Sequence, residues 1–76
     1  FLRVLGETFM MDKFIININA QANGVYEVHN ASKACEHLPK VENQNLLGFF
    51  ATSELAIKRA KMNWPREKIK GCVCCC

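Results

Sequence analysis

The alternation of apolar and polar residues predicts a β-hairpin in the first half of the chain. Residues 13–19 (KFIININ) are rich in isoleucine, and isoleucine alternates with asparagine at their end, which is the period of a strand with one buried face. Residues 20–24 (AQANG) end in Asn-Gly, a frequent turn sequence. Residues 25–29 (VYEVH) form a second strand-like run, so the two runs predict an antiparallel pair.

A third strand and one helix are predicted further along the chain. Residues 30–45 are polar and show neither period, which indicates a loop, and residues 46–50 (LLGFF) form a short apolar run typical of a strand. Thr52 is a suitable N-cap for a helix over residues 53–63, which ends before Pro65. The sequence therefore predicts an α+β fold with two or three antiparallel strands and one helix in the C-terminal half.

Within the predicted helix, apolar residues recur at spacings of three and four and form a stripe that can pack on the strands. Residues 66–71 are interpreted as a connection to the C-terminal cysteines, and Trp64 as an apolar side chain that fills the end of the helix. The apolar members of the stripe are Leu55, Ala56, Ala60 and Met62.

Length and composition indicate one small domain that depends on more than its apolar core. The chain has 76 residues, half of them apolar, and no apolar run approaches the roughly 20 residues of a membrane-spanning helix. We expect residues 12–76 to form a single metal-binding domain and residues 1–11 to be a flexible or non-native extension. A chain of this length buries only about 60–65% of its unfolded surface, so a metal, disulfides or a partner is commonly needed for stability.

Positive charge is concentrated near the C-terminus and suggests a polyanionic partner. The formal net charge is +3, but residues 58–70 contain six basic residues against one acidic residue. Such a segment can bind nucleic acid through its phosphates, or an acidic protein. Alternatively, the basic residues form a solvated helix face that binds no partner. The six residues are Lys58, Arg59, Lys61, Arg66, Lys68 and Lys70.

The positions of the five cysteines argue against a secreted disulfide scaffold. Four of them lie within the last five positions and only Cys35 lies elsewhere, so at most one long-range bridge could form. The N-terminal residues also lack the pattern of a secretory signal. We therefore expect a reducing, cytoplasmic environment in which the cysteines serve a metal.

Four residues form a candidate metal site: His29, Cys35, Cys72 and Cys75. Cys72 and Cys75 make a C-x2-C motif, and His29 and Cys35 lie on either side of a short loop. One imidazole and three thiolates suit zinc, which accepts nitrogen and sulfur donors in a tetrahedral arrangement. Taken singly, Cys35 is better interpreted as a small buried apolar residue and His29 as a strand-end imidazole, and only the four residues together favour a metal site. The alternative ligands are His37, Cys74 and Cys76.

Residues 24–75 resemble short bacterial proteins with the pattern V-H-x3-C-x2-L-P…E-N…L-G-x-F…A…A…G-C-x2-C, although five residues rather than three separate His29 from Cys35 here. More distantly the chain is similar to Ada-like metal-binding modules. The resemblance implies a small α+β module held together by zinc, with the same four ligands. The matching stretches are Val28-His29, Cys35-Glu36-His37-Leu38-Pro39, Glu42-Asn43, Leu47-Gly48-Phe49-Phe50, Ala56, Ala60 and Gly71-Cys72-Val73-Cys74-Cys75.

The function expected from these features is a non-catalytic zinc-binding module. One alternative is attachment to a membrane by lipid chains on the C-terminal cysteines, because a basic stretch followed by cysteines is also typical of lipidated tails. The other is a methyl acceptor, which the Ada-like resemblance implies, with the acceptor role falling on a metal-bound thiolate of Cys35, Cys72 or Cys75.

Overall fold

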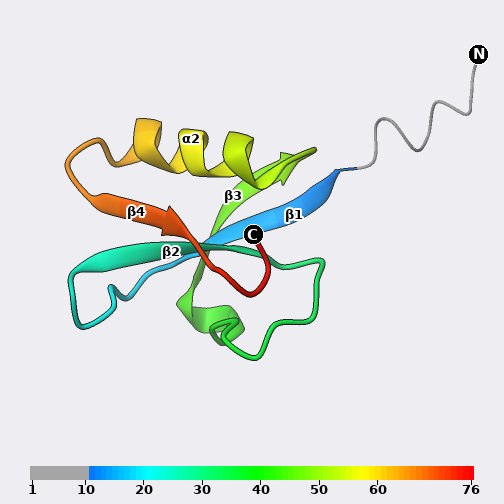
Figure 1. Ribbon diagram of the computed structural model, residues 1–76, viewed down its shortest axis with the longest axis horizontal. Coiled ribbons are helices and arrows are strands. Elements are labelled where there is room, and N and C mark those ends of the chain that lie inside the picture. Colours follow the sequence, from blue (N-terminus) through cyan, green and yellow to red (C-terminus); the bar gives the residue numbers. More distant parts are fainter. Residues whose placement is uncertain (1–10) are drawn as a thin grey trace, which may run out of the picture.

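A four-stranded mixed β-sheet organises residues 11–76, the part of the chain that the computed structural model describes (Figure 1). The strand order is β3-β1-β2-β4, in which β1 pairs antiparallel with β2 and β3, and β2 pairs parallel with β4. One helix covers one face of this sheet, so the predicted α+β class is confirmed. In chain order the elements are β1 (Asp12–Asn17), β2 (Val25–Asn30), the 3-10 helix η1 (Val41–Asn43), β3 (Gln44–Phe50), α2 (Ser53–Asn63) and β4 (Lys68–Gly71).

The predicted hairpin is present, but its first strand is shorter than expected. β1 ends at Asn17 because the Asn17 side chain accepts a hydrogen bond from the backbone N–H of Asn19 at 2.9 Å, which turns the chain out of the sheet. Ile18, which continued the alternating pattern, is 49% exposed. In the turn itself Gly24 has a φ of +84°, a conformation that glycine adopts without strain.

The fourth strand corrects the prediction of two or three antiparallel strands. Residues 66–71 were expected to be a connection, yet β4 lies parallel to β2, with Val25 opposite Lys68 and Val28 opposite Gly71. Its one apolar strand residue, Ile69, is 8% exposed and packs in the core beneath the helix. A single apolar residue between two lysines gives no periodic signal. This strand is specified by its pairing with β2 rather than by its own sequence.

The helix begins as predicted, but it buries a different stripe. The side chain of Thr52 accepts a hydrogen bond from the backbone N–H of Leu55 at 3.3 Å and caps the first turn. Ala56 and Ala60 are fully buried, and their small side chains let the helix backbone approach the sheet. Leu55 and Met62 are 49% and 66% exposed, so the predicted stripe was wrong for these two residues.

Two larger apolar residues near Ala56 and Ala60 complete the core between α2 and the sheet. Ile57 and Trp64 flank the buried alanines and are partly buried against the core, Trp64 at the end of the helix as predicted. The fully packed members of this core are Phe14, Ile16, Val28, Ala56, Ala60 and Ile69.

A bulge in β3 keeps two of its apolar residues on the helix side. The register with β1 slips between Phe14, which pairs with Gly48, and Ile15, which pairs with Leu46. Leu47 and Phe50 therefore both pack against the helix-side core although they lie three positions apart. Gly48 has a φ of +137°, which disfavours any residue with a Cβ at this position.

The opposite face of the sheet carries a second, separate buried region. Ile15 lies between two residues of the helix-side core along β1, so its side chain points to the other face. It is 1% exposed and pairs directly with His29 of β2, which is also 1% exposed. This face holds the candidate metal site.

Two further expectations concern the chain as a whole. The predicted extension, residues 1–11, lies outside the described residues except for Met11. Within residues 11–76, no helix has the length and apolar character needed to cross a lipid bilayer. α2, with 11 residues, is about 16 Å long, against a hydrocarbon thickness of about 30 Å.

Candidate metal centre

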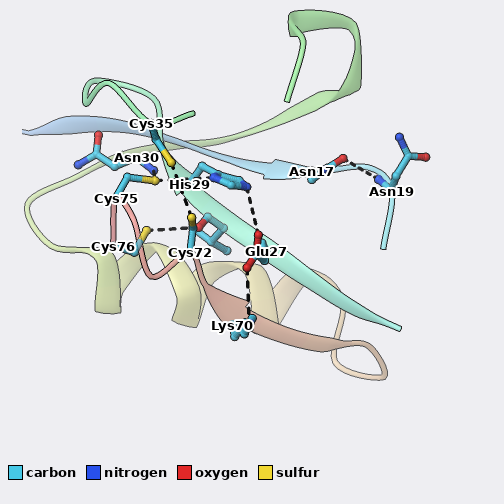
Figure 2. Close-up of polar contacts among 11 residues, drawn as sticks. Asn17, Asn19, Glu27, His29, Asn30, Cys35, Lys70, Cys72, Cys75 and Cys76 are labelled. Atoms are coloured by element: carbon cyan, nitrogen blue, oxygen red, sulfur yellow. Dashed lines mark hydrogen bonds and ion pairs between the residues drawn. The ribbon is translucent and has the colours of Figure 1, made fainter. Parts of the chain in front are cut away.

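The structure brings together the four residues that the sequence singled out. His29 lies near the end of β2, Cys35 in the loop that follows, and Cys72 and Cys75 directly after β4 (Figure 2). One ligand atom from each lies within 4.8 Å of every other. His29, Cys72 and Cys75 are buried, whereas Cys35 is partly exposed. The four side chains lie close enough to hold one metal ion.

The parallel pairing of β2 and β4 explains why residues so distant in sequence meet. Val28 is opposite Gly71 in the sheet, and the pairing continues as the backbone N–H of Cys72 donates to the carbonyl of Val28 at 2.9 Å. The residue after Val28 is His29, so the imidazole and the Cys72 thiol emerge next to each other. The fourth strand, which the sequence did not predict, is thus the element that assembles the site.

Two of the distances within the cluster match the edges of a tetrahedral metal site, and all four donor atoms lie within 4.8 Å of one another. The Sγ atoms of Cys35 and Cys72 are 3.8 Å apart, and Sγ of Cys75 is 3.7 Å from Nδ1 of His29. Bonds of about 2.3 Å from zinc to sulfur and about 2.0–2.1 Å to nitrogen give edges of about 3.8 and 3.6 Å in a tetrahedron. All five cysteines are free thiols, so no disulfide competes for these sulfurs.

Backbone hydrogen bonds fix the C-terminal turn that carries two of the thiols. The N–H of Cys76 donates to the carbonyl of Cys72 at 2.8 Å and closes one turn, and the N–H of Asn30 donates to Sγ of Cys75 at 3.3 Å. An N–H donor stabilises negative charge on a sulfur. The turn packs closely, because a Cβ on Gly71 would lie 2.9 Å from Cδ1 of Ile57 and 3.0 Å from Cβ of Cys76.

The loop that carries Cys35 is anchored at its start to β1. The backbone N–H of Ala31 donates to the carbonyl of Lys13 at 2.7 Å, and the N–H of Lys13 donates to Oγ of Ser32 at 3.0 Å. The side-chain amide of Asn30 donates to the carboxylate of Asp12 at 2.8 Å. These bonds fix the loop from its first residue, so Cys35 is directed back over the sheet.

Burial favours the neutral forms of His29 and Cys75 in the metal-free site. Desolvation lowers the pKa of His29, against the opposing effect of the Glu27 carboxylate, so the imidazole is in its metal-binding form at neutral pH. Desolvation also raises the pKa of the Cys75 thiol to about 12. The pKa of Cys35 is lowered, chiefly by a hydrogen bond from the Cys74 thiol. A bound cation would supply the positive charge that favours ionisation of the buried Cys75 thiol.

The three alternative ligands lie outside the cluster of four. The thiol of Cys76 donates to the carbonyl of Val28 at 3.3 Å. Cys74 and His37 are exposed and contribute no atom to the group within 4.8 Å. The structure therefore places both cysteines of the C-x2-C motif, Cys72 and Cys75, in the cluster, and leaves the adjacent Cys74 and Cys76 outside it.

Sequence reasoning missed Glu27, which lies behind His29, and considered Lys70 only as a contact for a polyanionic partner. Oε1 of Glu27 is 3.7 Å from Nε2 of His29, and Oε2 of Glu27 is 3.8 Å from Nζ of Lys70 (Figure 2). The signal available in the sequence is the spacing of two between Glu27 and His29, which places both on the same face of a strand.

The six basic residues of the C-terminal segment are exposed, but they do not form one patch. Lys58 and Lys61 lie on the helix, where they line a shallow hollow with Glu54 and Ile57. The two lysines of β4 alternate with buried Ile69 and therefore point away from the helix, to the face of the sheet that carries the metal site.

A cavity of about 230 Å³ lies at the other end of the sheet and shares no residue with the metal site. The end of β1 and the residues that follow the helix form its walls. It is lined by Ile16, Asn17, Ile18, Tyr26, Asn45, Trp64, Glu67 and Ile69.

Comparison with known proteins gave no match among protein-family models, curated proteins or solved structures. Function is therefore inferred from the geometry of the site.

Proposed function

We propose that this protein is a non-catalytic zinc-binding module. One Zn²⁺ is held by Nδ1 of His29 and the thiolates of Cys35, Cys72 and Cys75. The observation that carries the proposal is the convergence of these four donors within 4.8 Å, from three separate parts of the chain. One nitrogen and three sulfur donors with no carboxylate favour zinc over the harder ions magnesium and calcium.

The role of the ion is to stabilise the fold. Cys35 and Cys72 are separated by 36 residues, and the metal joins the loop after β2 to the chain after β4. Structural zinc in finger peptides contributes on the order of 10–16 kcal/mol at neutral pH. Since the helix-side core has only six fully packed residues, a contribution of that size would decide whether the chain folds.

Burial of the thiols supports a metal over the lipid-anchor alternative. Cys72 and Cys75 are 1% and 4% exposed, and an acyl or prenyl chain on either would have to leave the interior. Only Cys74 and Cys76 of the four C-terminal cysteines are exposed. The methyl-acceptor alternative would fall on Cys35, the one member of the cluster that solvent reaches.

The partner that we propose is a polyanion, either nucleic acid or an acidic protein. All six basic residues are exposed, and three of them lie on α2. Because such contacts release counterions, binding is expected to weaken steeply with salt. Replacing Lys58, Arg59 and Lys61 with glutamine should weaken binding to a duplex DNA probe at least tenfold in 50 mM salt. Unchanged affinity would exclude the helix as the contact.

Metal analysis of protein purified without chelator tests the zinc proposal. We expect about one zinc per chain, and the Cys72→Ser variant should lose it. Cys76→Ser is the matched control, because this neighbouring thiol lies outside the cluster, and it should keep the full stoichiometry. A wild-type protein that is folded and free of zinc would refute the proposal.

A further inference from the structure

A carboxylate that is largely buried lies directly behind the imidazole of the metal site. Glu27 is 14% exposed at its side chain, and His29 is 1% exposed. Both belong to β2 and both point away from the helix, since Val28 between them is fully buried in the helix-side core. A buried carboxylate is costly unless polar groups face it, so the neighbours of Glu27 indicate its role.

The two oxygens of Glu27 face two different partners. Oε1 lies 3.7 Å from Nε2 of His29, the ring nitrogen on the side away from Cys75. Oε2 lies 3.8 Å from Nζ of Lys70. Glu27 and Lys70 are direct partners in the parallel register of β2 and β4. The carboxylate is therefore held on one side by the fourth strand and presented on the other to the imidazole, as Figure 2 shows.

We propose that Glu27 is a positioning residue for the metal ligand His29, an inference that rests on the proposed zinc site. Glu27 accepts the Nε2–H of the imidazole and so selects the tautomer whose Nδ1 lone pair points at Cys75 and the metal. Lys70 keeps the carboxylate in place. The Nε2–Oε1 distance of 3.7 Å is longer than the 2.7–3.2 Å of a direct hydrogen bond, so the proposed bond requires the Glu27 carboxylate to move about 0.5 Å closer to the ring.

Carboxylates in this position behind a metal-bound histidine fix the ring and raise its basicity, and their loss costs about 10–100-fold in metal affinity. The Glu27→Met variant keeps the length of the side chain and removes both acceptors. We expect it to bind one zinc per chain with a 10–100-fold higher Kd in competition with a chromophoric chelator. Glu27→Gln keeps one acceptor oxygen and should restore part of the loss. Glu42→Met, at an exposed glutamate of η1, should equal the wild type.

The tautomer provides a readout that a purely structural role would not move. In zinc-loaded wild-type protein, the ¹⁵N spectrum of His29 should show Nδ1 bound to zinc and a proton on Nε2. This measurement needs no variant, so it decides the question even if Glu27→Met does not fold. Coordination through Nε2 would overturn the proposal, and so would a Kd of Glu27→Met within twofold of the wild type.

Lys70 and Lys68 offer a matched pair for the outer contact, because both are exposed lysines of β4 on the same face. Lys70→Met should raise the Kd for zinc by a few-fold, as expected for the loss of an ion pair that is partly exposed, whereas Lys68→Met should not. Equal effects of the two substitutions would remove Lys70 from the proposal. A wild-type protein that binds no zinc would instead refute the proposed function, so the two failures are distinguishable.

Discussion

Replacing Gly71 with alanine tests whether close packing holds the C-terminal turn over the metal site. The added Cβ would lie 2.9 Å from Cδ1 of Ile57 and 3.0 Å from Cβ of Cys76, whereas ordinary contacts begin near 3.4 Å. The Ile57 side chain or the turn that carries Cys76 must therefore shift by about 0.5 Å. Overpacking of this kind typically costs about 1–3 kcal/mol. For a domain of this size each kcal/mol lowers Tm by about 4–8 °C.

Ile57, the helix residue that the added Cβ would meet, provides a second variant that tests the cause of the destabilisation. Ile57→Val removes the Cδ1 atom that the new methyl group would meet, so the double variant should recover part of the loss. Thermal unfolding of the wild type, the two single variants and the double variant gives a double-mutant cycle, and we expect a favourable coupling of at least about 0.5 kcal/mol. Because Gly71 precedes Cys72, zinc affinity should also fall. An unchanged Tm for Gly71→Ala, or strictly additive effects with Ile57→Val, would refute the reasoning.

Three further predictions follow from the metal site and the helix. Removing the metal with a chelator should unfold the chain around Cys35 and β4 first, and hydrogen exchange should show the amides of β4 losing protection; unchanged protection would mean that no ion holds this strand. In metal-free protein that remains folded, the raised pKa of Cys75 contributes stability below about pH 9, and this stability is lost as the pH rises toward 12. Cys75→Ala should flatten that part of the pH profile in chemical denaturation, and an identical slope would exclude the thiol as its source. Thr52→Ala should lower the free energy of unfolding by about 1 kcal/mol, because it removes the side-chain oxygen that caps the helix. Ser53→Ala is the control: it removes a hydroxyl that does not cap the helix, so it should change the free energy of unfolding less.

Local signals made part of the fold predictable. The Asn-Gly turn and the two isoleucine- and valine-rich runs specify the β1–β2 hairpin through neighbouring residues, and Thr52 specifies the start of the helix through its own hydroxyl. Such features depend on residues close in sequence, so they can be recognised without tertiary structure.

The elements that the sequence did not predict depend on distant partners. β4 has one apolar residue and is a strand only because β2 supplies the register. The buried stripe of α2 centres on Ala56 and Ala60, because the sheet requires close approach there and leaves the larger Leu55 in solvent. Periodicity alone cannot choose between these faces of a weakly amphipathic helix.

The candidate site was predictable to a similar extent. The four donor residues were identifiable by type and spacing, because a C-x2-C motif together with a histidine and a further cysteine supplies the donors that zinc prefers. Glu27 was not, since a glutamate on a strand is usually a solvated residue, and its orientation toward His29 depends on the pairing of Glu27 with Lys70.

The parallel pairing of β2 with β4 also constrains how the protein folds. Every pair in this register joins residues 43 positions apart, so the chain must close a long loop before the donors of the metal site meet. Contacts of this kind form late and slowly. An ion that requires them contributes little to the folding transition state, so zinc should act mainly on the unfolding rate. Metal loading would then set the lifetime of the native protein rather than the speed at which it is reached.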